Sequence, residues 1–206
     1  MNEFDKINYK NHEITIFYDE SPQSPDDWGN EDAFLVYDHR DLTITRKGYD
    51  PQDIFDNCYS QNKKIYEGYW IFPVYALIHS GIWLSMRRTT FTQGCDPGGW
   101  DTSFRGFMLV KRQKGWTYTE NKAYDVANSM LTEWNDYLSG NVFGYQTDTD
   151  DSVWGYYGNP EKSGIIEDAK GSIDSWLIER AKTHTKQLKS YISKKVPIQY
   201  RKPMQL

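Results

Sequence analysis

The sequence contains few cysteines and no long apolar run. Among its 206 residues only Cys58 and Cys95 are cysteines. They lie far apart without a CxxC spacing, which favours two free thiols over a structural disulfide. No stretch approaches the ~18 uncharged apolar residues of a membrane span, and the first residues lack the basic and then apolar pattern of a signal peptide. We therefore expect a protein that neither spans a membrane nor is exported.

Motifs for metal ions and phosphates are also missing. The four histidines are scattered, without the HxxxH or HExxH spacing of a zinc site. The segment Gly94–Gly99 lacks the GxxxxGK pattern of a phosphate-binding loop. Asp148, Asp150 and Asp151 resemble part of a calcium loop, but its glycine and terminal glutamate are absent. We interpret both segments as turns and expect no metal site and no cofactor.

Aromatic residues, by contrast, are abundant. They make up 16% of the chain, with 16 Tyr and 8 Trp, whereas disordered chains contain few. A chain of this length loses ~70% of its unfolded accessible surface on folding, which is ample for a core. We expect a core built largely from aromatic rings.

Hydrophobic periodicity predicts two long amphipathic helices, at about residues 119–139 and 172–192. Gly140 is a natural end for the first helix. In the second, one apolar stripe contains Ile173, Trp176, Leu177, Ala181, His184, Leu188 and Tyr191.

Strand-like runs dominate the rest of the chain. Pro73 cannot donate to a ladder, so its strand should lie at an edge or carry a bulge. Asp50 and Pro51 predict the start of a short helix. The pattern favours an α+β fold in which an antiparallel or mixed sheet is covered by the two long helices. Without a linker or repeat, residues 1–193 should form one domain, followed by a basic tail, 194–206. The predicted strands span residues 9–18, 33–37, 64–78, 81–86 and 104–110, with a hairpin at 141–147 and 152–157.

Charge is distributed unevenly along the chain. The net charge is −5, but residues 1–60 contain fourteen acids against five bases, and residues from Glu179 onward contain eight bases against one acid. Such a dipolar chain can steer a charged partner, although opposite charges also simply solvate different faces.

The region from Tyr69 to Val110 contains the candidate catalytic side chains. A site could combine His79 and Ser80 with Asp96 or Asp101. Neighbours in an extended strand point to opposite faces, so His79 and Ser80 fit a hairpin bend better than a directly bonded pair. The alternative catalytic set is His79, Asp101 and Arg105.

Two segments are candidates for binding partners. In the first, Trp28 lies among carboxylates, and an aromatic anchor of this kind suits a protein interface with a basic partner. A Trp that caps the end of the barrel or sheet fits the same pattern equally well. In the second, the basic last helix suits nucleic acid. The candidate partner-binding residues are Asp26, Asp27, Trp28 and Asp32, and the candidate nucleic-acid-binding residues are Arg180, Lys186, Lys189, Lys194 and Lys195.

Several short motifs resemble those of a set of small proteins encoded by phages and other mobile elements. They are an Asp-Asp-x-Trp-Gly-Asn-like segment at residues 26–30, an apolar strand that runs into His-Ser-Gly at 79–81, a cysteine followed by Trp-Asp at 100–101, and Ser-x-Trp-Gly-x-Tyr-Gly at 152–158. The similarity covers about residues 10 to 160. The chain departs from the pattern by the insertion of residues 96–99 after Cys95, which puts a shared catalytic role of that loop in doubt.

The resemblance implies a protein that acts in the cytoplasm of an infected bacterial host. Accessory proteins of this setting often block host defences, so the leading hypothesis is a non-enzymatic inhibitor. It would bind a host defence effector protein, of the CRISPR or restriction type, or the guide RNA of that effector. The alternatives are a small enzyme that acts on nucleotides or nucleic acid and a single-stranded nucleic-acid-binding protein. Whether the chain forms a homo-oligomer stays open.

Overall fold

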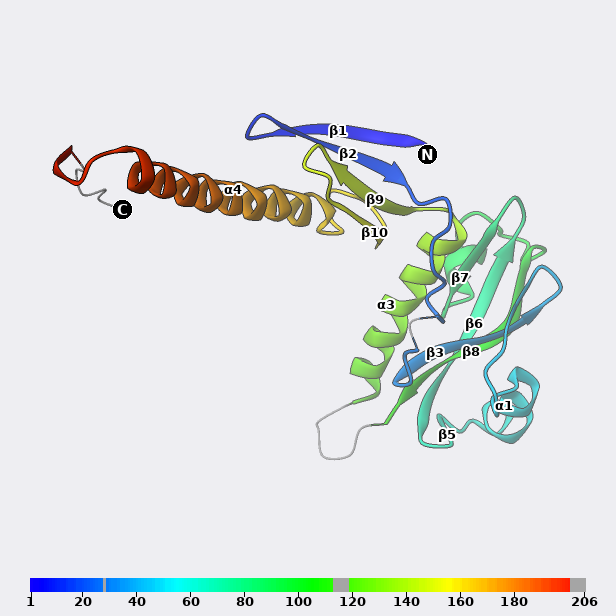
Figure 1. Ribbon diagram of the computed structural model, residues 1–206. Helices are drawn as coiled ribbons and strands as arrows, with labels where there is room; N and C mark the ends of the chain where they lie inside the picture. Colours follow the sequence, from blue (N-terminus) through cyan, green and yellow to red (C-terminus); the bar gives the residue numbers. More distant parts are fainter. Residues whose placement is uncertain (28, 113–118, 201–206) are drawn as a thin grey trace. The chain divides into compact units, whose positions relative to one another are not determined.

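The structure is a computed structural model that describes residues 1–27, 29–112 and 119–200 (Figure 1). The chain contains two compact units. The first unit comprises Met1–Tyr18, Phe143–Tyr156 and Pro160–Leu206, and the second comprises Asp19–Val142 and Tyr157–Asn159. The α+β class with antiparallel sheets is as predicted, but the strands form two sheets instead of one. The division into one domain and a tail stays a prediction.

A four-stranded sheet with the order β1-β2-β9-β10 forms the centre of the first unit. The strands are β1 (Glu3–Tyr9), β2 (His12–Tyr18), β9 (Val142–Thr147) and β10 (Ser152–Tyr157). β2 pairs antiparallel with both β1 and β9. β1 was not predicted, because it is an edge strand whose residues are mostly exposed and show no apolar alternation.

The long helix α4 (Ile165–Lys195) packs on this sheet through its N-terminal part only. Ile165, Ala169 and Ile173 are fully buried, against Ile14 and Phe143 among others. Beyond Leu177 the helix extends past the sheet, as the orange and red part of α4 in Figure 1 shows.

The sequence-based account of this helix needs two corrections. α4 begins seven residues earlier than the predicted 172. Its predicted apolar stripe is buried only at Ile173, whereas Leu188 and Tyr191 are 40% and 63% exposed. The helix also includes Lys194 and Lys195, and a short 3-10 turn, η2 (Ile198–Tyr200), follows it.

The second unit is built on a larger antiparallel sheet with the order β4-β3-β8-β6-β5, in which β7 also pairs with β6. Pro73 lies in β6 between the residues that pair with β5 and those that pair with β7. The register with β8 shifts between Val74 and Tyr75, where Arg105 of β8 is skipped in the pairing, so the bulge lies on β8. Pro73 itself pairs with β8 alone among the described strands, which is the expected edge position. The strands are β3 (Ala33–His39), β4 (Leu42–Ile44), β5 (Ile65–Tyr66), β6 (Tyr69–Ile78), β7 (Ile82–Ser85) and β8 (Thr102–Lys111).

Helices cover this sheet on both faces. On one face lies α3 (Glu120–Leu138), whose bounds match the prediction and whose Ala127, Leu131 and Trp134 are buried. Thr119 caps its N-terminus. On the other face lie α1 (Pro51–Asn57), capped by Asp50 as predicted, and η1 (Tyr59–Gln61). A short helix, α2 (Thr89–Thr92), follows β7.

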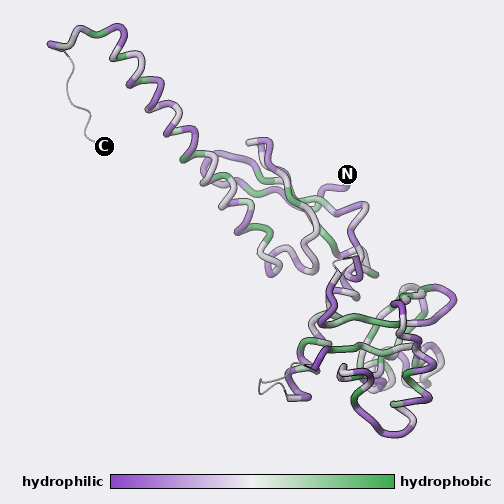
Figure 2. The backbone as a smooth tube through the Cα atoms, turned by 60° about the horizontal axis from the view of Figure 1, so that its bottom comes forward, coloured by the Kyte–Doolittle hydropathy of each residue, from purple (hydrophilic) through white to green (hydrophobic). Residues whose placement is uncertain are grey.

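The hydropathy of the residues agrees with this arrangement of strands and helices. In Figure 2 the hydrophobic residues are concentrated in the strands, whereas the helix that leads to the C-terminus is mostly hydrophilic with single hydrophobic residues. None of the helices in the described part of the chain combines the length and the apolar character that a membrane crossing requires.

Candidate functional site

The loop before β8 is organised by the buried carboxylate of Asp96, which is 7% exposed. Its Oδ1 accepts the backbone N–H of Trp100 at 3.0 Å, and its Oδ2 accepts the N–H of Asp101 at 3.1 Å and the hydroxyl of Thr102 at 2.7 Å. The hydrogen bond from Thr102, supported by those from the backbone, lowers the pKa of Asp96. Asp96 is therefore a structural anion that holds the backbone of Asp101 in place.

Asp101 in turn approaches His79. The backbone N–H of Ile78, at the end of β6, donates to the carbonyl of Asp101 at 3.0 Å. This bond brings the next residue, His79, beside Asp101, and its Nδ1 lies 3.2 Å from Oδ2 of the carboxylate. Both side chains reach solvent, with 77% and 46% exposed. The pair is thus a surface contact whose effect on stability is small.

The His79–Asp101 pair borders a cavity of about 260 Å³, slightly below the ~300 Å³ at which ligand pockets of proteins begin. His79, Ser80 and Gly81 form the bend between β6 and β7, as expected, and the N–H of His79 donates to the carbonyl of Gly81. The bend and the loop before β8 meet here, and we call the space the His79 cavity. It is lined by Leu77, His79, Ser80, Gly81, Trp83, Cys95 and Asp101.

Residues from two of the four motifs meet at the His79 cavity. The His-Ser-Gly bend, the cysteine and the aspartate of Trp-Asp all line it, whereas Trp100 is 91% exposed and does not. Trp83 was not singled out from the sequence, because an isolated Trp in a strand resembles a core residue. It is 48% exposed instead, and it lines the cavity.

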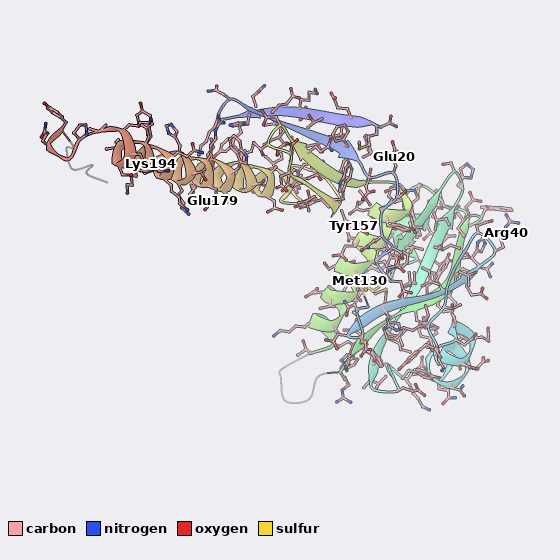
Figure 3. The ribbon with its side chains drawn as sticks, in the orientation of Figure 1. Glu20, Arg40, Met130, Tyr157, Glu179 and Lys194 are labelled. Atoms are coloured by element: carbon pink, nitrogen blue, oxygen red, sulfur yellow. The ribbon has the colours of Figure 1, made fainter. Side chains whose placement is uncertain are left out.

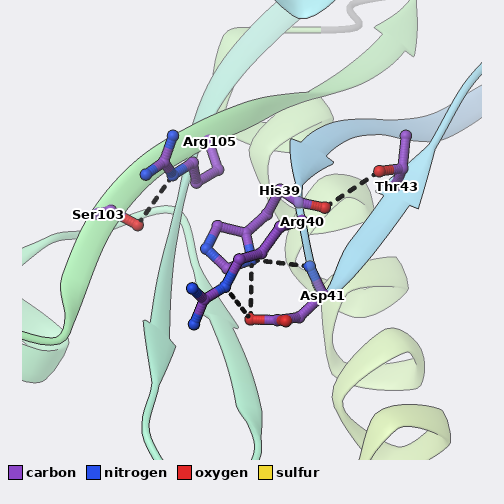
Figure 4. Close-up of polar contacts among 6 residues, drawn as sticks. All are labelled: His39, Arg40, Asp41, Thr43, Ser103 and Arg105. Atoms are coloured by element: carbon purple, nitrogen blue, oxygen red, sulfur yellow. Dashed lines mark hydrogen bonds and ion pairs between the residues drawn. The ribbon is translucent and has the colours of Figure 1, made fainter.

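Arg105 is not part of this arrangement. It lies in β8 at the register shift opposite Val74 and Tyr75, and its Nε donates to Ser103 Oγ at 3.3 Å. Figure 4 shows it near the turn between β3 and β4, which carries His39 and Asp41. Of the alternative catalytic set, the structure therefore brings together His79 and Asp101 but not Arg105.

The two cysteines have opposite environments. Both are free thiols, as expected. Cys58 is buried, its thiol donates to the carbonyl of Ile65 at 3.1 Å, and burial raises its pKa. Cys95 is exposed at the His79 cavity. Only Cys95 is therefore accessible to a reagent from solvent.

The acidic segment has mostly local contacts. Oδ2 of Asp27 accepts the N–H of Ser24 at 3.1 Å, and Oδ1 of Asp32 lies 3.1 Å from the ammonium of Lys111. Asp26 is half-buried in the same turn. Trp28, the predicted anchor, lies outside the described residues. A partner-binding role for Asp26, Asp27, Trp28 and Asp32 stays a prediction.

The candidate basic residues lie on the part of α4 that extends past its sheet. In Figure 3 the labels Glu179 and Lys194 lie near the two ends of this part of the helix. One cation contacts the helix itself, since the guanidinium of Arg180 lies 4.9 Å from the ring centroid of Trp176. The predicted residues Arg180, Lys186, Lys189, Lys194 and Lys195 are all exposed, as is Lys182.

Within the described residues, no three His, Cys, Asp or Glu side chains form a group that could hold a metal ion. We found no match to the chain among family models, curated proteins or solved structures. The resemblance to mobile-element proteins therefore rests on the short motifs alone and stays a prediction.

Proposed function

We propose that this protein is a phage or mobile-element accessory protein that inhibits a host nucleic-acid-directed defence, of the CRISPR or restriction type. It acts in the cytoplasm of the bacterial host by stoichiometric binding to the effector protein. The binding surface is the exposed C-terminal half of α4. The observation that carries this proposal is a row of mostly apolar side chains, with Ile178 and Leu188 exposed, beside lysines on the part of α4 that extends past its sheet.

The spacing of the apolar row fits another helix. Its members, which we call the α4 stripe, are Ile178, Ala181, Thr185, Leu188 and Ile192, separated by alternating steps of three and four residues. This 3,4 spacing places side chains along one line of a helix, as at the a and d positions of a coiled coil. Ile178 and Leu188 are 55% and 40% exposed. Burial of these apolar side chains against a partner is favourable at roughly 25 cal/mol per Å².

Charge defines the partner further. Lys182, Lys186 and Lys189 follow each other at steps of four and three, so they form a second row, and together with Ile178, Ala181 and Thr185 they line one shallow groove. α4 contains no acid from Arg180 to its end, so a second copy of the chain would place lysines against lysines. An acidic amphipathic helix on the effector protein suits both rows, because its apolar side packs on the α4 stripe and its carboxylates pair with the lysines. Exposed apolar residues favour such a protein surface over a guide RNA, which would need the lysines alone.

A matched pair of variants tests this proposal. In Ile178→Gln/Leu188→Gln the α4 stripe is made polar, whereas Thr183→Gln/Ser190→Gln changes the opposite, exposed side of the same helix. Each variant is used as bait in the lysate of a defence-competent host treated with nuclease. A recovered defence effector is then purified and titrated against the bait by calorimetry.

We expect one effector per bait for the wild type and the control, and at least tenfold weaker binding for the stripe variant. Binding that is unchanged in the stripe variant, or that is lost on nuclease treatment, would contradict the proposal. The latter outcome would instead indicate the guide RNA as the target.

A further inference from the structure

We propose that the His79 cavity is a nucleophilic site for small acyl groups. In this site the thiol of Cys95 attacks the carbonyl carbon of a small ester or thioester, and His79, oriented by Asp101, takes up the thiol proton. This inference is independent of the proposed function, because the cavity belongs to the second unit and the α4 stripe to the first.

The first argument is preorganisation. The carboxylate of Asp96 holds the N–H groups of Trp100 and Asp101, and the carbonyl of Asp101 holds the N–H of Ile78. A series of contacts therefore connects the buried carboxylate of Asp96 to Asp101, and Asp101 to His79. A positioning chain of this kind fixes the geometry of a catalytic imidazole before substrate arrives.

The second argument is the orientation of the imidazole. Oδ2 of Asp101 lies 3.2 Å from Nδ1 of His79, so the carboxylate favours the tautomer with the proton on Nδ1. Nε2 is then the basic nitrogen. Asp101 is a positioning residue in this arrangement, and His79 is the general base.

The third argument is the nucleophile. Cys95 precedes the anchoring Asp96, whose own N–H donates to the carbonyl of Phe91 at 2.9 Å, so the backbone next to the thiol is held. Cys95 lines the same cavity as His79 and Asp101. A thiol activated by an imidazole that a carboxylate orients is an established arrangement for acyl transfer on unrelated folds.

The size and walls of the cavity define the substrate class. About 260 Å³ accommodates a small group. Leu77 and Trp83 provide apolar walls that suit the carbon atoms of an acyl chain, while Ser80 lies at the polar rim of the bend. A short-chain ester or thioester fits this combination.

The reaction proceeds in two balanced steps. As the bond between Sγ of Cys95 and the acyl carbon forms, the thiol proton moves to Nε2 of His79. The bond to the leaving oxygen or sulfur then breaks, and the leaving group takes that proton. In the second step water attacks the acyl carbon, its proton passes through His79, and Cys95 is released with its proton restored.

The test uses p-nitrophenyl acetate as the probe and the full chain as the protein. Acetylation of each cysteine is followed by mass spectrometry of peptides, and p-nitrophenolate release is followed by absorbance. Buried Cys58 is an internal control for non-specific reaction. His184→Ala, which removes an exposed histidine on α4, is the control variant for the loss of an imidazole.

We expect Cys95 to be acetylated at least tenfold faster than Cys58 and faster than the thiol of free glutathione. His79→Ala should lower the rate at Cys95 at least tenfold, and Asp101→Asn should lower the maximal rate at saturating ester without changing the ester concentration for half-maximal rate. His184→Ala should change neither. Because the His79 and Asp101 side chains are exposed, both variants should fold, which circular dichroism checks.

Two outcomes would overturn the inference. One is a rate at Cys95 no greater than that of glutathione, and the other is a fast rate that His79→Ala leaves unchanged. Neither outcome affects binding through the α4 stripe, which is measured separately.

Discussion

The side-chain amide of Asn135 on α3 hydrogen-bonds both backbone groups of Leu84 on β7. Its Oδ1 accepts the N–H of Leu84 at 2.7 Å, and its Nδ2 donates to the carbonyl of Leu84 at 2.9 Å. β7 pairs with β6 on one side, so the amide occupies the position that a further strand would have. One side chain from a helix thereby satisfies part of a sheet edge that would otherwise expose unpaired groups.

Asn135→Leu should destabilise the second unit. The substitution leaves the N–H and the carbonyl of Leu84 without partners in a residue that is 4% exposed, and an unsatisfied buried group costs about 1–3 kcal/mol. Urea unfolding should show a lower free energy of unfolding by about that amount. Asn128→Leu, at an exposed position of the same helix, should stay within ~0.5 kcal/mol of the wild type. Equal stabilities of the two variants would mean that the Asn135–Leu84 bonds contribute nothing.

Gly106 and Gly171 should respond to alanine in opposite directions. A Cβ at Gly106 in β8 would lie 2.1 Å from the carbonyl oxygen of Val36 and 2.8 Å from Cα of Tyr37. Both are backbone atoms of the paired strand β3, so the clash cannot be relieved by a rotamer change, and we expect a loss of at least ~3 kcal/mol.

A Cβ at Gly171 in α4 meets nothing within 4 Å, and alanine in a helix is favoured over glycine by ~0.8–1 kcal/mol. Thermal unfolding of both variants measures the two effects. A gain in stability for Gly106→Ala would show that β3 and β8 lie farther apart than the structure places them.

The first unit should lose stability in alkali because of Tyr145. Burial, followed by the negative charge of Asp151, raises the pKa of Tyr145 from 10.0 to about 12. Burial and Asp168 also raise the pKa of Tyr156. A raised pKa means that the folded state keeps the phenolic proton to higher pH than the unfolded state. The resulting stabilisation is complete below pH 10 and is lost as the pH rises from 10 towards 12.

Tyr145→Phe should therefore flatten this decline, which chemical unfolding at a series of pH values between 9 and ~12 would reveal. Tyr191→Phe, at a position 63% exposed, is the control and should follow the wild type. A Tyr145→Phe profile that falls as steeply as that of the wild type would assign the decline to other groups, such as Lys6 and Lys10, whose pKa values are also raised.

Several elements could be predicted because their signals are local. The bounds of α3 follow from a 3.6-residue apolar period, a Thr119 cap and Gly140 just beyond the end. Asp50 and Pro51 likewise mark the start of α1. The start of α4 was missed because Gly171 interrupts the helical pattern, although Ile165, Ala169 and Ile173 continue it at steps of four.

The candidate site could be predicted only in part. Both His79 and Asp101 were candidates, but they are twenty-two residues apart in the sequence. That separation does not tell how far apart the two side chains lie in the fold. They meet because β6 and β8 pair antiparallel, which places the end of one strand beside the start of the other. Arg105 is only four residues from Asp101 in the sequence, yet it is the residue at the register shift in β8 and does not line the cavity.

Local periodicity and capping determined where most helices and strands lie, since these signals act between residues a few positions apart. The tertiary structure decided which apolar stripe is buried and which is not. α3 and α4 both contain an apolar stripe, more marked in α3. The larger sheet covers the stripe of α3 along its length, whereas the smaller sheet meets α4 only as far as Leu177. Burial depends on the area that a partner offers, and that area is a property of the assembled sheet, not of the helix.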